Sequence, residues 1–463
     1  MSPNEIDSLN AETLKGLVLS LLGKIDDLHA HNKEILENNK ALLARIDELL
    51  ARIAELEGRA GKPPKTPSNS SVPPSRGQKA NVAAGKKKKR KGRPGVTREL
   101  CPNPDATRDI YVKGVPAADQ VLAHAYDHVE LPPIKPVTTR INLYRATLPC
   151  GKTVTADPPV DMPPGSPFGA GIVALVTYLH GSQMIGYARL VEVLDGLFGL
   201  KISEGAIANM LKRAGVPFAE AAETIHETVR NSPVIASDET SARVKGKTHW
   251  QWTFVTATAI AHLIAPTRGK IVPTEFLDDA APQVWISDRF VSQCNLAAVH
   301  QYCLSHLIRD AQYAIDAGDT VFAPEFKEFL KRACDIGRRR PGLADSTMKQ
   351  YARTLERELD DLLKLKPSNA EGRHLRDTII ADARDKLLVF MTRRDVDPTN
   401  NACERALRPS VIFRRVTNGF RSDWGAKVYA DFCSIVATGR LNGRAALEAI
   451  RAALTSCSVF ATT

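Results

Sequence analysis

Two short stretches of sequence decide the fold: 233–238, PVIASD, and 283–288, QVWISD. Each is an apolar run of strand length that ends in Ser-Asp, so each predicts a buried β-strand with a carboxylate at its carboxyl end. Ligands of open α/β sheets bind beyond the carboxyl ends of strands, and neighbouring strands lie about 5 Å apart. Asp238 and Asp288 are therefore expected to share a divalent metal ion. A single Asp in such a place is most often only a turn residue, and it is the repetition that favours a site.

The sequence around these two stretches predicts a mixed α/β core. Residues 249–256 and 259–264 have the composition of strands, and the segment 243–247, which contains Gly246, is the expected hairpin turn before them. A crossover helix is expected near 273–279, a fifth strand over 297–302 and a helix over 304–317. Residues 320–392 are predicted to be a long, charged helical stretch.

A third carboxylate comes from a helix that starts near residue 400. Glu404 lies in its first turn, three residues after Asn401, which is expected to cap the helix. Carboxylates supply the oxygen ligands that Mg²⁺ or Mn²⁺ prefers. Two such ions about 4 Å apart can activate the attacking oxygen and stabilise the leaving oxygen of a phosphodiester. Asp238, Asp288 and Glu404 are thus the predicted catalytic and metal-binding residues.

Residues 1–58 carry a heptad repeat, in which one apolar set recurs every seven positions and a second set follows it by four. The first set is Leu14, Leu21, Leu28, Ile35, Leu42, Leu49 and Leu56. The second set is Val18, Ile25, Asn32, Asn39, Ile46 and Ile53. The pattern is typical of a left-handed coiled coil, and Asn at the seam sets the register and favours two strands. We predict a homodimer; the alternative is one amphipathic helix packed on its own globular domain.

Residues 59–99 are rich in Pro, Ser, Asn, Gly and Lys, which predicts a disordered basic linker. Seven cations fall within eight of its residues: Lys86, Lys87, Lys88, Lys89, Arg90, Lys91 and Arg93. Such a block cannot pack in a core, and DNA phosphates are its natural counter-charge. The alternative is a solvated tail.

Residues 100–165 predict short strands and turns with many prolines. Cys101 and Cys150 lie in this segment, but it has no Cys-x-x-Cys pair, so a zinc site is not expected.

Residues 166–230 are predicted to be helical, with Ser203 as the N-cap of a helix over 204–214 that follows a Gly-containing turn. The outward residues Asn209, Lys212 and Arg213 fit a helix-turn-helix that binds DNA. A helical hairpin that only packs on the rest of the protein is the alternative.

The composition excludes several classes of protein. The 463 residues are 43% apolar, which is enough for a large core, and the net charge of +11 favours an anionic partner. The longest nearly apolar run, 168–179, is too short to span a bilayer, and the polar N-terminus is not a secretory signal. Eight scattered cysteines argue against a disulfide framework and fit a reducing compartment, so we expect a cytoplasmic protein without a membrane partner.

Five motifs, in this order and spacing, resemble those of DDE transposases of the insertion sequence sixty-six family. They are KGRPG at 91–95, VIASDET around Asp238, VWISDRF around Asp288, YCLSHLIRD at 302–310 and TNNACERALRPSVIFRR at 399–415. The resemblance implies an RNase-H-like catalytic core over 231–318 and 393–440, a helical insertion over 319–392 and a C-terminal tail over 441–463. It also implies that Asp238, Asp288 and Glu404 are a metal-binding triad.

The resemblance further implies a function in a bacterial cell. The expected activity is metal-dependent cleavage and strand transfer, with two Mg²⁺ or Mn²⁺ ions per site and double-stranded DNA, as transposon ends and target, for substrate. Companion proteins of the same element and association with the nucleoid are also implied. Family members carry a zinc-ribbon-like segment after the linker with two Cys-x-x-Cys pairs; here these are reduced to Cys101 and Cys150, so 100–165 is predicted to be a degenerate form of it.

Basic residues close to Glu404 suit bidentate contact with phosphate, and Arg408, Arg414 and Arg415 are predicted to bind DNA. The pair Cys303-x-x-His306 resembles a signature that precedes the third acid in several transposase groups; it is either a metal-ligating pair or a buried structural pair at a helix start. Two rival functions remain open: a nuclease of RNase-H-like fold that only cuts, and a DNA-binding regulator built on an inactive core.

Overall fold

A five-stranded mixed sheet organises the core of the computed structural model, which describes residues 11–60, 62–70, 98–160, 162 and 164–460. The strands are β3 (Val234–Val244), β4 (Lys247–Val255), β5 (Ile260–Ala265), β6 (Val284–Ser287) and β7 (Val299–Tyr302). Their order across the sheet is β5-β4-β3-β6-β7, with β3, β4 and β5 antiparallel and with β6 and β7 parallel to β3. The mixed α/β class expected from the sequence is confirmed.

The hairpin between β3 and β4 makes β3 longer than the sequence predicts. A two-residue turn joins Val244 to Lys247, and its residues Lys245 and Gly246 have φ values of 50° and 75°. This left-handed turn matches the twist of the flanking strands. Because β3 continues as far as the hairpin turn, Asp238 lies within an 11-residue strand and not at its end, whereas Asp288 directly follows β6 as predicted.

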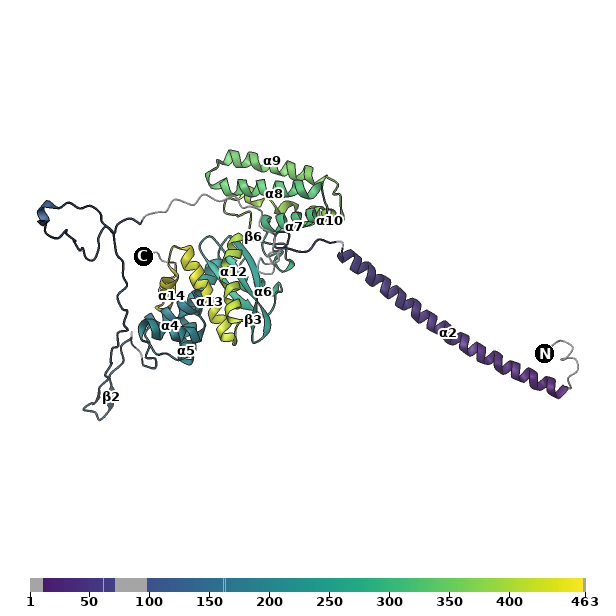
Figure 1. Ribbon diagram of the computed structural model, residues 1–463, viewed down its shortest axis with the longest axis horizontal. Helices are drawn as coiled ribbons and strands as arrows, with labels where there is room; N and C mark the ends of the chain where they lie inside the picture. Colours follow the sequence, from purple (N-terminus) through teal and green to yellow (C-terminus); the bar gives the residue numbers. More distant parts are fainter. Residues whose placement is uncertain (1–10, 61, 71–97, 161, 163, 461–463) are drawn as a thin grey trace.

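Helices cover both faces of the sheet (Figure 1). On one face, residues such as Ala236 and Ile286 pack in a cluster with α7 (Leu304–Asp316), α8 (Phe322–Arg339), α9 (Asp345–Leu363) and α10 (Ala370–Thr378). On the other face, Ile235 and Trp285 pack with α5 (Glu204–Arg230), α6 (Ile271–Leu277), α13 (Asp423–Leu441) and α14 (Ala446–Leu454). Successive side chains of a strand point to opposite faces, so the two buried faces explain the continuous apolar runs of the sequence.

The insertion between Asp288 and Glu404 is helical, as predicted. It comprises α8, α9, α10 and α11 (Val389–Thr392), and α7 leads into it from β7. After the insertion, α12 (Asn401–Thr417) returns to pack against β3 and β4. Asn400 is the N-cap residue of α12 and Asn401 is the first helical residue, so the predicted N-cap is wrong by one position. The side chain of Asn400 makes no capping hydrogen bond.

The region before the sheet contains α3 (Ala170–Thr177), α4 (Tyr187–Phe198) and α5. Gly199 ends α4 in the left-handed conformation, and the Ser203 hydroxyl accepts the N–H of Ala206 at 3.2 Å, so the predicted N-cap is confirmed. However, α5 does not stop at residue 214. It continues to Arg230 because apolar residues in its second half, among them Phe218 and Val229, are buried with the sheet.

The N-terminal helix α2 (Ala11–Ala60) projects away from the core (Figure 1). Its apolar heptad residues between Leu14 and Leu49 are exposed, with Leu28 62% and Leu42 61% accessible. Residues 98–160 are largely irregular and exposed, with one short hairpin of β1 (Arg145–Thr147) and β2 (Thr153–Thr155). Within the described residues, no helix is long and apolar enough to cross a membrane.

Candidate active site

Three elements deliver the predicted acids to one region. The parallel register pairs Val234 with Val284 and Ala236 with Ile286, so its continuation by two residues sets Asp238 beside Asp288. Neighbouring strands lie about 5 Å apart, which limits the separation of the two backbones. Glu404 comes from the first turn of α12, which packs against β3.

Electrostatics links the three carboxylates. Burial raises the pKa of Asp238 well above its ordinary value, and the negative charges of Glu239, Asp288 and Glu404 raise it further. The Oδ1 atom of Asp238 accepts a hydrogen bond from the backbone N–H of Glu239 at 2.9 Å, and this hydrogen bond lowers the pKa of Asp238. A buried carboxyl group among like charges is costly unless a cation or a proton neutralises it.

Glu404 has a cationic partner within the protein. Its Oε1 atom lies 2.9 Å from Nη2 of Arg309 and 3.9 Å from Nε2 of His306, both on α7. The side chain of Asp288 accepts the N–H of Phe290 at 2.9 Å. In this arrangement, the described residues contain no group of three His, Cys, Asp or Glu side chains close enough to hold a metal ion.

The donor set nevertheless fits a hard divalent cation. All three groups are carboxylates, which are the ligands that Mg²⁺ and Mn²⁺ prefer, and Asp238, whose pKa burial raises, lacks a basic side-chain partner among the described residues. A cation between Asp238 and Asp288 would relieve the repulsion that raises the pKa of Asp238. The Glu404 carboxylate, which would complete the set, is bound by Arg309.

A buried chain of polar contacts ties these elements together. The Sγ atom of Cys303, just before α7, accepts the N–H of Asn400 at 3.3 Å. The side-chain amide of Asn400 points to the carbonyl oxygen of Ser237, next to Asp238, at 3.5 Å. Burial raises the pKa of Cys303 to about 12, so this group is a thiol and not a thiolate. Of the two interpretations of Cys303-x-x-His306, the contacts of Cys303 favour the structural one.

The sequence analysis missed a second layer around Glu239. This carboxylate accepts hydrogen bonds from Nε of Arg268 at 2.7 Å and from Nε2 of Gln293 at 2.5 Å, and Gln293 in turn accepts a hydrogen bond from Ser237. The Arg268 guanidinium also lies 3.7 Å from the ring centre of Phe290 and 4.8 Å from that of Trp250. Arg268 therefore contacts the strand of Asp238 and the loop after Asp288 at once.

The only local signal for this layer is the acid that follows Asp238 in the motif SDET. Arg268 is 29 residues from Glu239 and Gln293 is 54 residues from it. Pairings over such separations have no periodicity in the sequence, so the two partners could not be found from it.

The predicted DNA-binding residues are spread over several surfaces. Asn209, Lys212 and Arg213 are exposed on α5, as predicted, and Arg213 donates to the Ser166 hydroxyl at 3.1 Å. Arg408 lines a cavity of about 970 Å³. The cations at 86–91 and 93 lie outside the described residues.

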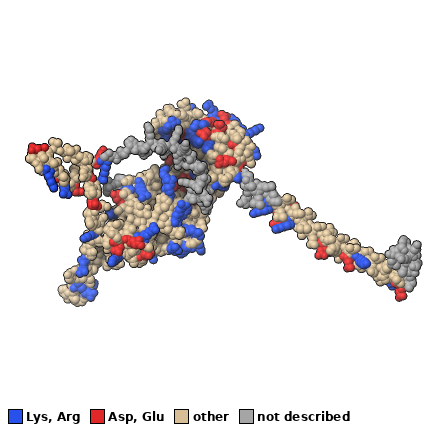
Figure 2. Space-filling view, viewed as in Figure 1, with Lys and Arg blue, Asp and Glu red and all other residues tan. Residues whose placement is uncertain are grey.

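Arg414 and Arg415 line a different cavity, of about 840 Å³. The Arg414 guanidinium donates to Thr240 Oγ1 at 3.1 Å and also to Ser241 on β3. Lys and Arg side chains are visible on the core as well as along α2 (Figure 2).

This fold defines a mixed α/β protein in which β3, the loop after β6 and α12 carry the acids Asp238, Asp288 and Glu404. Residues 165–428, more than half of the chain, match the family model described as Transposase IS66 family. The chain belongs to this family, and the match supports a transposase. The matched range includes Asp238, Asp288 and Glu404. No curated protein matches the chain.

Proposed function

We propose that the chain is the transposase of a bacterial insertion sequence, which binds transposon ends and catalyses metal-dependent DNA cleavage and strand transfer. The observation that carries the proposal is the parallel register of β3 and β6, whose continuation sets Asp238 beside Asp288, with Glu404 of α12 coupled electrostatically to Asp238. The match to the transposase family supports the same function. A mixed sheet with its first strand central and bearing the first acid is compatible with the RNase-H-like core that we propose for 231–318 and 393–440.

In this proposal Asp238, Asp288 and Glu404 hold two Mg²⁺ or Mn²⁺ ions. Bound there, the ions would supply Lewis-acid stabilisation of the charge that develops on the attacking and leaving oxygens of the phosphodiester. The protein contributes the placement of the acids: the sheet fixes two of them, and Cys303 and Asn400 hold the start of α12 against β3. Arg268 fixes the loop after Asp288 through Phe290.

We further propose that the chain acts as a homodimer joined by a coiled coil of α2. The support is the row of exposed heptad residues on this helix, which one chain leaves without cover. Paired subunits suit a reaction that brings two DNA ends together. The basic block at 86–93 is proposed to bind DNA phosphates. The proposal also includes companion proteins of the same element as partners in the reaction.

A strand-transfer assay tests the function directly. Purified protein, Mg²⁺ and a labelled duplex that carries the DNA flanking the gene are incubated with a supercoiled target plasmid. The proposal expects the label joined covalently to the plasmid, together with nicked ends. Cleavage without joined product would favour the nuclease, and binding without either product would favour the regulator on an inactive core.

A further inference from the structure

Part of the segment predicted as a linker contacts the core instead. Residues 62–70, here called the strap, lie against α7 and α10. Asn69 is only 3% exposed, although composition alone places it in a Pro/Ser-rich linker. Lys62 forms an ion pair with Glu371 of α10 at 3.1 Å, so the strap is attached near both of its ends.

The anchoring of Asn69 is specific. Its Oδ1 atom accepts the N–H of Thr66 at 2.6 Å, and its Nδ2 atom donates to the carbonyl of Pro64 at 3.1 Å and to Oδ2 of Asp316 at 2.8 Å. One side chain thus closes a turn within the strap and attaches that turn to the end of α7. A buried amide whose donors and acceptor are satisfied defines one position for the segment.

In this position the strap forms one wall of the 840 Å³ cavity that Arg414 and Arg415 also line. Lys65 of the strap lies at the cavity, and Arg268 and Arg289 line it from the loops after β5 and β6. Lys65 and Arg415 are exposed, and among the described residues neither has an ion-pair partner. The two acids that line the cavity each have an ion-pair partner: Asp310 pairs with Arg289 at 2.6 Å, and Glu371 pairs with Lys62.

Two arginines connect the lining of the cavity to the candidate active site. Arg268 binds Glu239, the residue after Asp238, and Arg289 directly follows Asp288. Five basic side chains from four elements line this cavity, and such a set suits a chain of phosphates and not a single small anion. Trp250 and Tyr313 add aromatic surface to the same cavity.

We propose that the strap and the arginines of this cavity bind the sugar–phosphate backbone of a DNA strand next to the candidate active site. The proposal rests on the proposed function for the identity of the substrate. It gives residues 62–70 a binding role in place of a spacer role. Because α2 ends at Ala60, close to the start of the strap, the proposal also sets the carboxyl-terminal end of this helix beside the bound strand.

The first test measures DNA binding by the full chain in EDTA, so that no cleavage occurs. Fluorescence anisotropy with a labelled 20-mer compares wild type with Lys65→Glu, Asn69→Ala and a control, Lys364→Glu. Lys364 lies just after α9, is paired with Asp361 and does not line the cavity. Lys65→Glu is expected to weaken binding about tenfold and to reduce the slope of log K against log salt by about one unit, whereas the control stays near wild type.

The second test follows the strap itself. Trypsin cleavage at Lys65–Thr66, followed by mass spectrometry, is expected to be slow in wild type and faster in Asn69→Ala. Bound DNA is expected to slow the cleavage of the wild-type chain further. Equal binding by Lys65→Glu and Lys364→Glu would overturn the proposal, as would full competition by a mononucleotide at the same phosphate concentration. Strap-dependent binding by a protein that forms no strand-transfer product would keep this proposal and refute the proposed function.

Discussion

Arg309 on α7 binds Glu404 on α12, with Nη2 and Oε1 2.9 Å apart. The guanidinium group of Arg309 is therefore paired with the carboxylate that the proposed metal site needs. Both side chains are only partly exposed, at 24% and 34%, so their attraction is less screened than that of a surface pair. We infer that Arg309 competes with a divalent cation for Glu404 before DNA binds.

The first prediction follows from this competition. Arg309→Gln removes a positive charge next to the acids, so the free protein should bind Mn²⁺ several-fold more tightly, as measured by electron paramagnetic resonance of unbound Mn²⁺. Arg332→Gln is the control, because Arg332 pairs with Glu358 in the helical insertion. Weaker Mn²⁺ binding by Arg309→Gln would mean that Arg309 orients Glu404 for the metal and does not compete with it.

The second prediction concerns the three acids. Asp238→Asn, Asp288→Asn and Glu404→Gln keep the side-chain shape but remove charge that the metal ions require, so each should abolish cleavage and strand transfer. DNA binding in EDTA should remain nearly intact. Asp335→Asn, at an exposed site on α8, is the control and should retain activity. Strand transfer near the wild-type rate in any one of the three variants would remove that residue from the triad.

The third prediction concerns α2. Leu28→Asp with Leu42→Asp places charge in the apolar stripe and should convert a dimer to a monomer, as judged by light scattering of the full chain. Leu22→Asp with Leu36→Asp, at exposed positions outside the two heptad sets, is the control. A wild-type chain that is monomeric at high micromolar concentration would contradict the dimer.

The fourth prediction tests the exposed face of α5. If this face enters the major groove, Asn209→Ala and Arg213→Ala should lower the preference for the transposon end over scrambled DNA, at about 1 to 3 kcal/mol for each good base contact. Lys212→Ala should weaken both complexes alike, because Lys more often meets phosphate. Competition binding at fixed salt decides the point. An unchanged preference in all three variants would favour the helical hairpin that only packs.

Local patterns account for what the sequence predicted well. The two Ser-Asp runs form neighbouring parallel strands because both of their faces are buried, and the Ser203 cap depends on residues three positions apart. The site residues that escaped prediction depend on distant partners. Asn69 is fixed by Asp316, 247 residues away, so the composition of its own segment indicates only a linker. Likewise, the length of β3 is set by its pairing with β4, not by its own apolar run.

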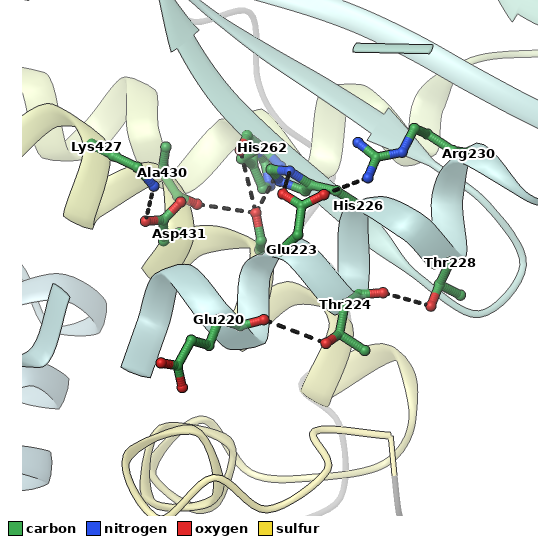
Figure 3. Close-up of polar contacts among 11 residues, drawn as sticks. Glu220, Glu223, Thr224, His226, Thr228, Arg230, His262, Lys427, Ala430 and Asp431 are labelled. Carbon is green, nitrogen blue, oxygen red and sulfur yellow. Dashed lines mark hydrogen bonds and ion pairs between the residues drawn. The ribbon is translucent and has the colours of Figure 1, made fainter. Parts of the chain in front are cut away.

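The last prediction concerns stability in acid, and its focus is His262 on β5, whose side chain faces α5 and α13 (Figure 3). Burial lowers the pKa of His262 to about 3, and the charge of the neighbouring His226 contributes in the same direction. The Nδ1 atom of His262 lies 3.4 Å from Nε2 of Gln251, and its Nε2 atom has no hydrogen-bond partner among the described residues. The charged groups nearest this layer are Glu223 and Arg230 on α5 and Lys427 and Asp431 on α13.

The folded state keeps His262 neutral, whereas the unfolded chain protonates it near pH 6.5. Below pH 6.5 the unfolded state therefore binds one more proton than the folded state, and the free energy of unfolding falls until the pH reaches about 3. At pH 5 the loss from this residue is about 2 kcal/mol relative to neutral pH. His262→Gln cannot take up this proton, so urea unfolding between pH 7.5 and 5 should show a shallower decline than in wild type. An equally steep decline in the variant would mean that other groups, such as His226, carry the acid sensitivity.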